Sequence, residues 1–331
     1  MNSLTHKTAM AATVAAFVAL GGPAAAHAKS NNAHPVRADV KNGTLVVSGG
    51  DRDDAVALRL APGDPTRIQV DVRDDGTADF SFARAGVNAI QVDTGAGVDS
   101  ARIDDANGAF TDAIPTSIAG GRGDDSLRGG TGAERFSGGD GRDSVVGGRG
   151  NDSASLGRGN DTFTWNPGDA SDTIEGRRGR DTMLFNGSAV AENIVLSDDG
   201  GRLRFTRDVA NITMDTDGVE KVDFNALGGT DNIRVNDLRA TDVTETDLDL
   251  AGTPGGSAGD GAVDNVFVAG TNGNDRIRVD TDGSEADVTG LAAAVSITNG
   301  DPTDRVSLDT LLGRDRVLLD RGPGGLQVFV D

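Results

Sequence analysis

The amino-acid sequence predicts an all-β fold, in which a parallel β-roll or β-solenoid occupies the centre and strand–turn–strand repeat units flank it. First, a nine-residue phrase repeats in tandem between residues 120 and 184, and a short fixed period is typical of a stack of identical turns. Second, glycine accounts for 48 of 331 residues and aromatic residues for only 4%, which suits the thin core of a solenoid better than a conventional globule. Third, alternating apolar residues separated by aspartate and glycine indicate half-buried strands in the flanks.

The chain begins with a segment typical of a secretory signal peptide, residues 1–28. A basic residue, Lys7, precedes an apolar stretch from Ala9 to Leu20, and small residues around His27 form a cleavage signal. The apolar stretch is too short to span a membrane as a helix. We therefore expect a secreted, extracellular protein (periplasmic if the host has an outer membrane), with residues 29–39 as a flexible tail.

The flanks follow a longer frame of strand, turn and strand. Residues 220–235 and 304–319 place apolar residues, glycine and aspartate at identical offsets. Aspartate–glycine pairs between apolar runs are a hairpin signal, and they occur at residues 75–76, 199–200 and 282–283. These patterns predict three related β units, at 40–118, 185–250 and 263–331, with a loop at 251–262.

Each flanking turn keeps one aspartate but only one or two glycines. Two interpretations stay open for these turns. They are ordinary β-turns in which aspartate makes local hydrogen bonds, or they are weak Ca²⁺ sites.

The central block, residues 119–184, has the most regular phrase: glycine, glycine, variable, glycine, variable, aspartate, polar, apolar, variable. Its clearest copies are residues 120–127, 138–145 and 147–154. Glycine permits positive φ and lets carbonyl groups crowd together, and the sixth-position carboxylate adds a hard oxygen that suits Ca²⁺. The eighth-position residue is expected to point into a narrow core formed by Leu127, Phe136, Val145, Ala154, Phe163, Ile174 and Met183.

This phrase resembles the nonapeptide of RTX (repeats-in-toxin) proteins. The resemblance implies a parallel β-roll in which Ca²⁺ lies between stacked turns, held by repeat aspartates and loop carbonyls. The residues that it implies at metal sites are Asp125, Asp143, Asp152, Asp161, Asp172 and Asp181, together with the turn glycines Gly121, Gly123, Gly139, Gly141, Gly148, Gly150 and Gly159.

Two departures from the phrase affect one side of the roll. Alternate repeats stack on the same side, which groups Asp125, Asp143, Asp161 and Asp181 on one edge and Glu134, Asp152 and Asp172 on the other. Glu134 replaces an aspartate, and Pro167 lies in an insertion that lengthens the step from Asp161 to Asp172. We therefore expect the first edge to bind Ca²⁺ better than the second.

The composition narrows the function classes. A net charge of −21 disfavours nucleic acid and anionic membranes as partners and favours divalent cations. The chain has no cysteine or tyrosine, and its three histidines lie at residues 6, 27 and 34. Nucleophilic catalysis that depends on histidine and a histidine-ligated zinc site are therefore not supported.

These observations predict a secreted, non-enzymatic calcium-binding protein whose repeats fold when Ca²⁺ binds. Without Ca²⁺, carboxylates about 4.8 Å apart along an edge should repel one another, so that metal binding contributes directly to folding. Two alternatives remain. One is an extracellular adhesin or matrix protein with a Ca²⁺-stiffened solenoid and a cell-surface partner, and the other is a carbohydrate-active β-helix enzyme.

Overall fold

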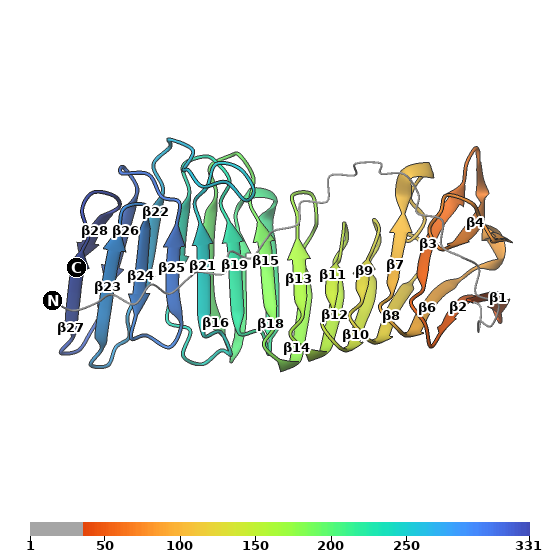
Figure 1. Ribbon diagram of the computed structural model, residues 1–331, viewed down its shortest axis with the longest axis horizontal. Helices are drawn as coiled ribbons and strands as arrows, with labels where there is room; N and C mark the ends of the chain where they lie inside the picture. The colour runs from red at the N-terminus through yellow and green to blue at the C-terminus, as the bar shows by residue number, and fades with distance from the viewer. Residues whose placement is uncertain (1–35) are drawn as a thin grey trace.

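The protein is an elongated solenoid of two β-sheets, as seen in the computed structural model, which describes residues 36–331 (Figure 1). The predicted signal peptide lies outside the described residues, as does most of the predicted tail. A strand nevertheless begins at Arg37, within the segment expected to be that tail. In the part of the chain that the structure describes, no helix is long and apolar enough to cross a bilayer.

Each sheet contains 14 strands. In spatial order, sheet A consists of β1 (Arg37–Lys41), β2 (Thr44–Gly50), β6 (Ala89–Ala96), β8 (Thr116–Arg122), β10 (Glu134–Asp140), β12 (Ser153–Gly159), β14 (Thr173–Gly179), β18 (Ile212–Asp217), β17 (Arg202–Arg207), β16 (Asn193–Asp199), β20 (Asn232–Val235), β22 (Asn265–Ala269), β26 (Arg305–Asp309) and β28 (Gln327–Val330). Sheet B consists of β5 (Phe80–Ala83), β4 (Asp64–Val72), β3 (Ala55–Ala61), β7 (Ser100–Asp104), β9 (Ser126–Arg128), β11 (Ser144–Val146), β13 (Thr162–Trp165), β15 (Thr182–Asn186), β19 (Lys221–Asn225), β21 (Glu245–Asp249), β25 (Ala294–Thr298), β24 (Glu285–Thr289), β23 (Arg276–Asp282) and β27 (Arg316–Arg321). Short 3-10 helices are η1 (Arg84–Gly86), η2 (Asp105–Asn107) and η3 (Val209–Asn211).

In the central block the chain alternates between the sheets, one strand at a time. Neighbouring strands of each sheet pair in parallel, so that Phe136 on β10 lies beside Ile118 on β8 and Ala154 on β12. Because successive side chains of a strand point to opposite faces, this register stacks the apolar residues between the sheets. All seven eighth-position residues are buried there, as the sequence predicts. The predicted all-β roll is thus confirmed.

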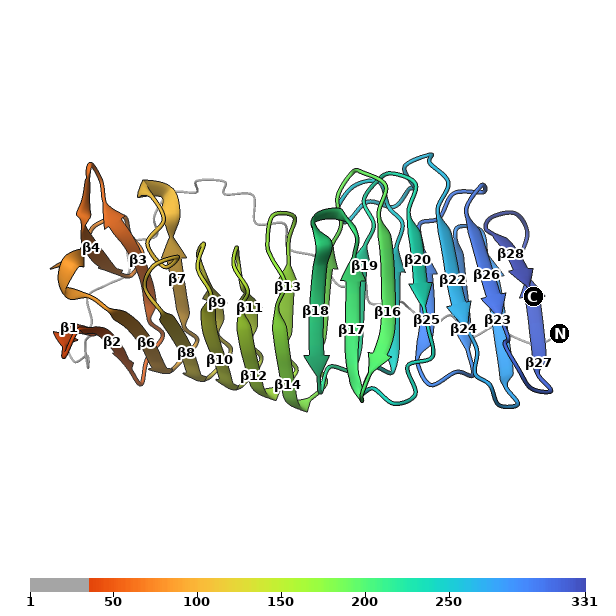
Figure 2. The ribbon, with the colours of Figure 1, turned by 180° about the vertical axis from the view of Figure 1, so that it is seen from behind.

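The three aspartate–glycine signals all form antiparallel hairpins. They connect β4 to β5, β16 to β17, and β23 to β24. Each hairpin belongs to a three-stranded antiparallel meander, namely β3–β4–β5 and β23–β24–β25 in sheet B (Figure 1) and β16–β17–β18 in sheet A (Figure 2). The sequence indicates the hairpins, but it does not indicate which sheet receives the added strands.

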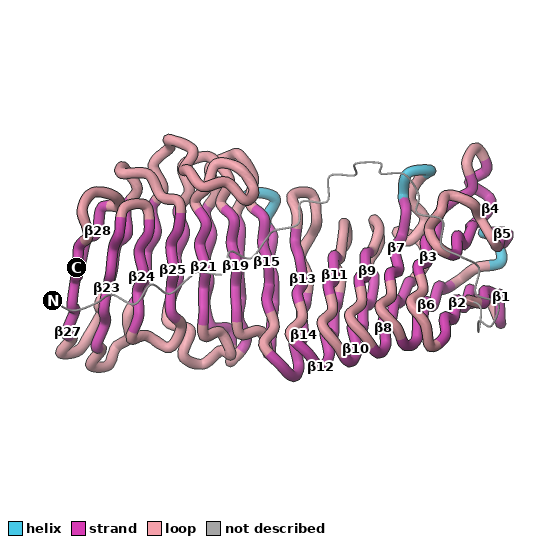
Figure 3. Tube along the Cα trace, in the orientation of Figure 1, coloured by secondary structure: helices cyan, strands magenta, loops and turns pink. Residues whose placement is uncertain are grey.

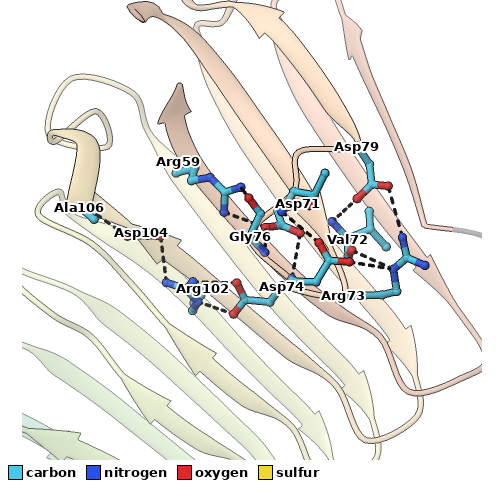
Figure 4. Close-up of polar contacts among 12 residues, drawn as sticks. Arg59, Asp71, Val72, Arg73, Asp74, Gly76, Asp79, Arg102, Asp104 and Ala106 are labelled. Atoms are coloured by element: carbon cyan, nitrogen blue, oxygen red, sulfur yellow. Dashed lines mark hydrogen bonds and ion pairs between the residues drawn. The ribbon is translucent and has the colours of Figure 1, made fainter. Parts of the chain in front are cut away.

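The hairpin between β4 and β5 is held by a buried ion pair (Figure 4). The Arg59 guanidinium donates to Asp71 Oδ2 at 2.8 Å and to the carbonyl oxygen of Gly76 at 2.9 Å. The Gly76 amide in turn donates to Asp71 Oδ2. Arg102 on the neighbouring strand β7 forms a bidentate pair with Asp74. The pair between Arg102 and Asp74 therefore holds the hairpin turn against the neighbouring coil.

The core continues from the central block into the C-terminal flank. Trp165 is fully buried and stacks on Phe185 with ring centroids 4.0 Å apart. Phe185 contacts Phe205 and Phe224, which belong to the next coils. Beyond this junction, longer loops gather along the edge at which the chain returns from sheet B to sheet A (Figure 3).

Candidate metal sites

Acidic residues form a row along the edge where the chain passes from sheet A to sheet B, here called the A-to-B edge. In each coil the amide of the repeat acid donates to the carboxylate Oδ1 of the acid in the next coil. The N–O distances are 2.8 Å from Asp99 to Asp125, 2.9 Å from Asp125 to Asp143, 2.8 Å from Asp143 to Asp161 and 2.9 Å from Asp161 to Asp181. One carboxylate oxygen of each acid therefore links two coils.

The opposite edge, here called the B-to-A edge, carries a second row with the same contact. The Glu134 amide donates to Asp152 Oδ1 at 2.7 Å, and the Asp152 amide donates to Asp172 Oδ1 at 2.8 Å. The insertion that contains Pro167 forms a separate turn, closed by a hydrogen bond from the Asp169 amide to the carbonyl oxygen of Asn166. The Asp152–Asp172 contact is preserved because the added residues lie outside the row.

The second carboxylate oxygen of each repeat acid is buried and accepts no hydrogen bond within the described residues. This holds for Asp125, Glu134, Asp143, Asp152, Asp161, Asp172 and Asp181, each of which is at most 3% exposed. A buried oxygen without a partner is costly for a carboxylate. Such an oxygen is well suited to be a ligand of a metal cation.

Burial raises the pKa of these carboxyl groups well above the usual range for aspartate. The pKa is about 6 for Asp125 and Asp181 and about 7 for Asp143. On the B-to-A edge it reaches about 9 for Asp152 and about 8 for Asp172. Loss of hydration is the main cause, and repulsion from neighbouring carboxylates adds to it.

The first glycine of the phrase brings the free carboxylate oxygen close to carbonyl groups of the next coil. A Cβ atom on Gly138 would lie 2.4 Å from Asp143 Oδ2 and 2.3 Å from the carbonyl oxygen of Leu156. On Gly176 it would lie 2.6 Å from Asp181 Oδ2 and 1.8 Å from the carbonyl oxygen of Gly218. The absence of a side chain therefore lets two kinds of oxygen face the same small space.

The glycines that the sequence singles out lie in the turns between the sheets or in the last residues of the strands that lead into them. Their φ angles are positive, for example 112° at Gly121 and 126° at Gly139. A Cβ atom on Gly139 would lie 2.0 Å from the carbonyl oxygen of Gly121 in the preceding coil. Equivalent glycines of successive coils make the same contact, so that their carbonyl oxygens form a row along each edge. Gly123, Gly141, Gly148, Gly150 and Gly159 share the positive φ.

The sequence reasoning did not identify the first-position glycines, among them Gly138 and Gly129, as part of the site. A signal was available, because glycine precedes the acid by five residues in most copies of the phrase. The rows also extend beyond the central block. The Asp54 amide donates to Asp99 Oδ1, and the Asp181 amide donates to Glu220 Oε2.

The donor set is suited to Ca²⁺, which prefers carboxylate and carbonyl oxygens in flexible geometry. Within residues 36–331, no three acidic, histidine or cysteine side chains gather in a group that could hold a metal ion. An ion at these turns would therefore be held by repeat carboxylates together with backbone carbonyls, and it would satisfy the free carboxylate oxygens.

Comparison with known families agrees with this geometry. The model of the RTX calcium-binding nonapeptide repeat matches residues 117–145, 128–163 and 168–186, with four copies. A search of curated proteins found none that matches the chain. The central turns, with their rows of buried carboxylates, are thus RTX calcium-binding nonapeptide repeats folded as a β-roll.

Proposed function

We propose that this chain is a secreted, non-enzymatic protein whose β-roll is stabilised by Ca²⁺ bound between successive coils. The observation that carries the proposal is the unpartnered carboxylate oxygen that recurs in every repeat of the central block. Asp125, Asp143, Asp161 and Asp181 would hold ions on the A-to-B edge, and Glu134, Asp152 and Asp172 on the B-to-A edge. Carbonyl groups of the turn glycines would complete the ligand sets.

The bound ion would supply positive charge where the chain itself supplies little. Because the repeat acids lose hydration on folding, their ionised forms oppose the folded state. A divalent cation offsets this penalty and removes the repulsion between neighbouring coils. Extracellular Ca²⁺ modules have dissociation constants of roughly 10⁻⁴–10⁻³ M. The β-roll would therefore be incompletely folded where Ca²⁺ is scarce and rigid outside the cell.

Two features support the non-enzymatic and secreted parts of the proposal. Residues 36–331 contain no histidine, cysteine or tyrosine, which removes the side chains that most often act as nucleophile or general base near neutral pH. The amino-terminal sequence is typical of an export signal.

Urea unfolding of the whole chain tests calcium binding. We expect about 10 mM Ca²⁺, roughly ten times the upper end of the range for extracellular modules, to raise the free energy of unfolding by at least about 1.4 kcal/mol for each occupied site. Circular dichroism and the fluorescence of Trp165, the only tryptophan, would report the transition. Mg²⁺ at the same concentration is the control, because it demands stricter octahedral geometry. Identical unfolding curves in Ca²⁺ and in EDTA would refute the proposal.

A further inference from the structure

A separate acidic row lies along the B-to-A edge in the C-terminal flank, beyond the segments between residues 117 and 186 that match the repeat family. The Glu192 amide donates to Asp231 Oδ1 at 2.8 Å. The Asp231 amide donates to Asp264 Oδ1 at 2.8 Å, and the Asp264 amide donates to Asp304 Oδ1 at 2.9 Å. This contact is the same as the one that links the acids of the RTX repeats.

The middle of this row is deeply buried and strongly negative. Asp231 is fully buried, and its Oδ2 accepts no hydrogen bond within the described residues. The charged groups that act most strongly on its carboxylate are all acids, namely Glu192, Asp260 and Asp264. Asp264 likewise faces Asp304, Asp260 and Asp301. A bound cation would relieve the repulsion between these carboxylates.

Glu192, at one end of the row, differs because a cation already accompanies it. Arg207 donates from Nε to Glu192 Oε1 at 2.8 Å, and both side chains are buried. The need for an additional positive charge is therefore greatest around Asp231 and Asp264, one and two coils further along.

Backbone oxygens approach the row as they do in the RTX repeats. A Cβ atom on Gly187 would lie 2.6 Å from Glu192 Oε2, 2.8 Å from the carbonyl oxygen of Ala226 and 2.9 Å from that of Asn225. Glycine again precedes the acid by five residues, and the carbonyls belong to the next coil. One oxygen of Glu192 and two carbonyl oxygens from the segment that leads to Asp231 thus lie close together between these two coils, and oxygens of these kinds are the ligands that hard cations prefer.

We propose that the free Oδ2 of Asp231, with the neighbouring carboxylate of Asp264 and carbonyl groups of the adjoining turns, binds a hard divalent cation of the Ca²⁺ class between coils. This inference rests on the proposed function, because it extends calcium binding to turns that lack the nonapeptide. Calcium would then stabilise the C-terminal flank as well as the central β-roll.

Substitution of Asp231 by Asn tests this site in the whole chain. Asparagine keeps the Oδ1 acceptor for the Glu192 amide and places an NH₂ donor where the free oxygen lies. After removal of metal and titration with CaCl₂, native mass spectrometry should show about one fewer bound Ca²⁺ ion in D231N than in the unmodified chain. The matched control is D287N, which changes an exposed aspartate on the outer face of β24 and should leave the number of ions unchanged.

D143N, in the central block, separates the two proposals. If D143N loses an ion and D231N does not, the flank site is wrong and the proposed function stands. If the unmodified chain binds no Ca²⁺, both proposals fail.

Hydrogen exchange on the unmodified chain keeps the test decisive if D231N does not fold. Ca²⁺ should slow exchange at the amides of Glu192, Asp231 and Asp264, since these amides donate along the row. Exchange at these amides that is the same with and without Ca²⁺ would overturn the flank site.

Discussion

Each repeat acid plays two roles with its two oxygens. In Asp143, Oδ1 accepts the amide of Asp125 at 2.9 Å, whereas Oδ2 has no partner and faces the space left by Gly138. Oδ1 links neighbouring coils by a hydrogen bond that needs no metal. The buried charge on Oδ2 is left uncompensated, and a bound cation would neutralise it. Glycine is needed at position 138 because a carboxylate oxygen and a carbonyl oxygen approach its Cα so closely that no side chain would fit.

Substitution of Gly138 by Ala is expected to weaken both folding and Ca²⁺ binding. The added Cβ would meet Asp143 Oδ2 and the Leu156 carbonyl at distances that real side chains do not tolerate. The resulting shift should cost about 1–3 kcal/mol in unfolding free energy, measured by urea titration with and without Ca²⁺. G86A is the control, because a Cβ on Gly86 meets no atom within 4 Å. Equal effects of the two substitutions would contradict the close approach.

At this scale the sequence predicts some features and not others. The spacing of the phrase places Asp125 and Asp143 on one edge and Asp152 on the other, because strand alternation fixes which turns share a side. The spacing does not reveal that the Asp152–Asp172 contact survives the Pro167 insertion. That outcome depends on where the added backbone closes its own turn, which is a property of the folded coil.

At the scale of elements, the junction between the central block and the C-terminal flank combines an aromatic stack with a buried ion pair. Arg207 on β17 pairs with Glu192, which immediately precedes β16, and its guanidinium lies 5.3 Å from the centroid of the Trp165 ring. The Arg207 side chain also donates to Ser188. Arg207 therefore links the meander to Trp165 on β13, within the β-roll.

Replacement of Arg207 by Met should be strongly destabilising, because it leaves the Glu192 carboxylate buried without a counter-charge. Loss of one partner of a buried pair costs about 3–5 kcal/mol, which urea unfolding followed by Trp165 fluorescence can measure. R204M on the same strand is the control. Arg204 and its partner Asp199 are exposed, so the free energy should change by about 0.5 kcal/mol or less. Recovery of most of the loss in R207M/E192Q would show that the unpaired charge is the cause.

The elements themselves are only partly predictable. Asp199–Gly200 and Asp282–Gly283 mark hairpins, because such pairs accommodate tight turns. Both hairpins form, but one extends sheet A and the other extends sheet B. The choice depends on which sheet the preceding strand occupies, and this requires counting every crossover from the beginning of the chain.

At the scale of the whole molecule, the excess of acid dominates. The chain carries a net charge of −21, and its repeat carboxyl groups have raised pKa values because they are buried beside one another. Protons and Ca²⁺ therefore compete to neutralise the same groups. Metal affinity depends on pH wherever ligands must lose protons first.

The metal-free chain is expected to be most stable in acid. A carboxyl group whose pKa is raised on folding stabilises the folded state below its unfolded pKa and loses that contribution as pH rises through the folded value. For Asp143, Asp172 and Asp152 the folded pKa values are about 7, about 8 and about 9. Stability without metal should thus fall between about pH 4 and pH 9, whereas the gain from Ca²⁺ should grow over that range.

Thermal unfolding at about pH 5 and about pH 8, with metal-free and Ca²⁺-loaded protein, measures this dependence. The melting temperature of the metal-free chain should be higher at the lower pH, and the increase caused by Ca²⁺ should be larger at the higher pH. A metal-free chain that is more stable at the higher pH would contradict the assignment of buried, uncompensated carboxylates.

The β16–β17–β18 and β23–β24–β25 meanders have a geometric consequence for the C-terminal flank of the solenoid. Sheet A has three strands between β14 and β20, and sheet B has three strands between β21 and β27, where a simple coil would supply one. Between the two insertions, sheet A is two strands ahead of sheet B, which corresponds to about 10 Å along the solenoid. Each connection from sheet B back to sheet A in this region must therefore cross at a slant instead of joining strands that lie opposite each other. The second insertion brings the sheets back into phase. A chain that had only one of the two would transmit the mismatch to all the coils beyond it.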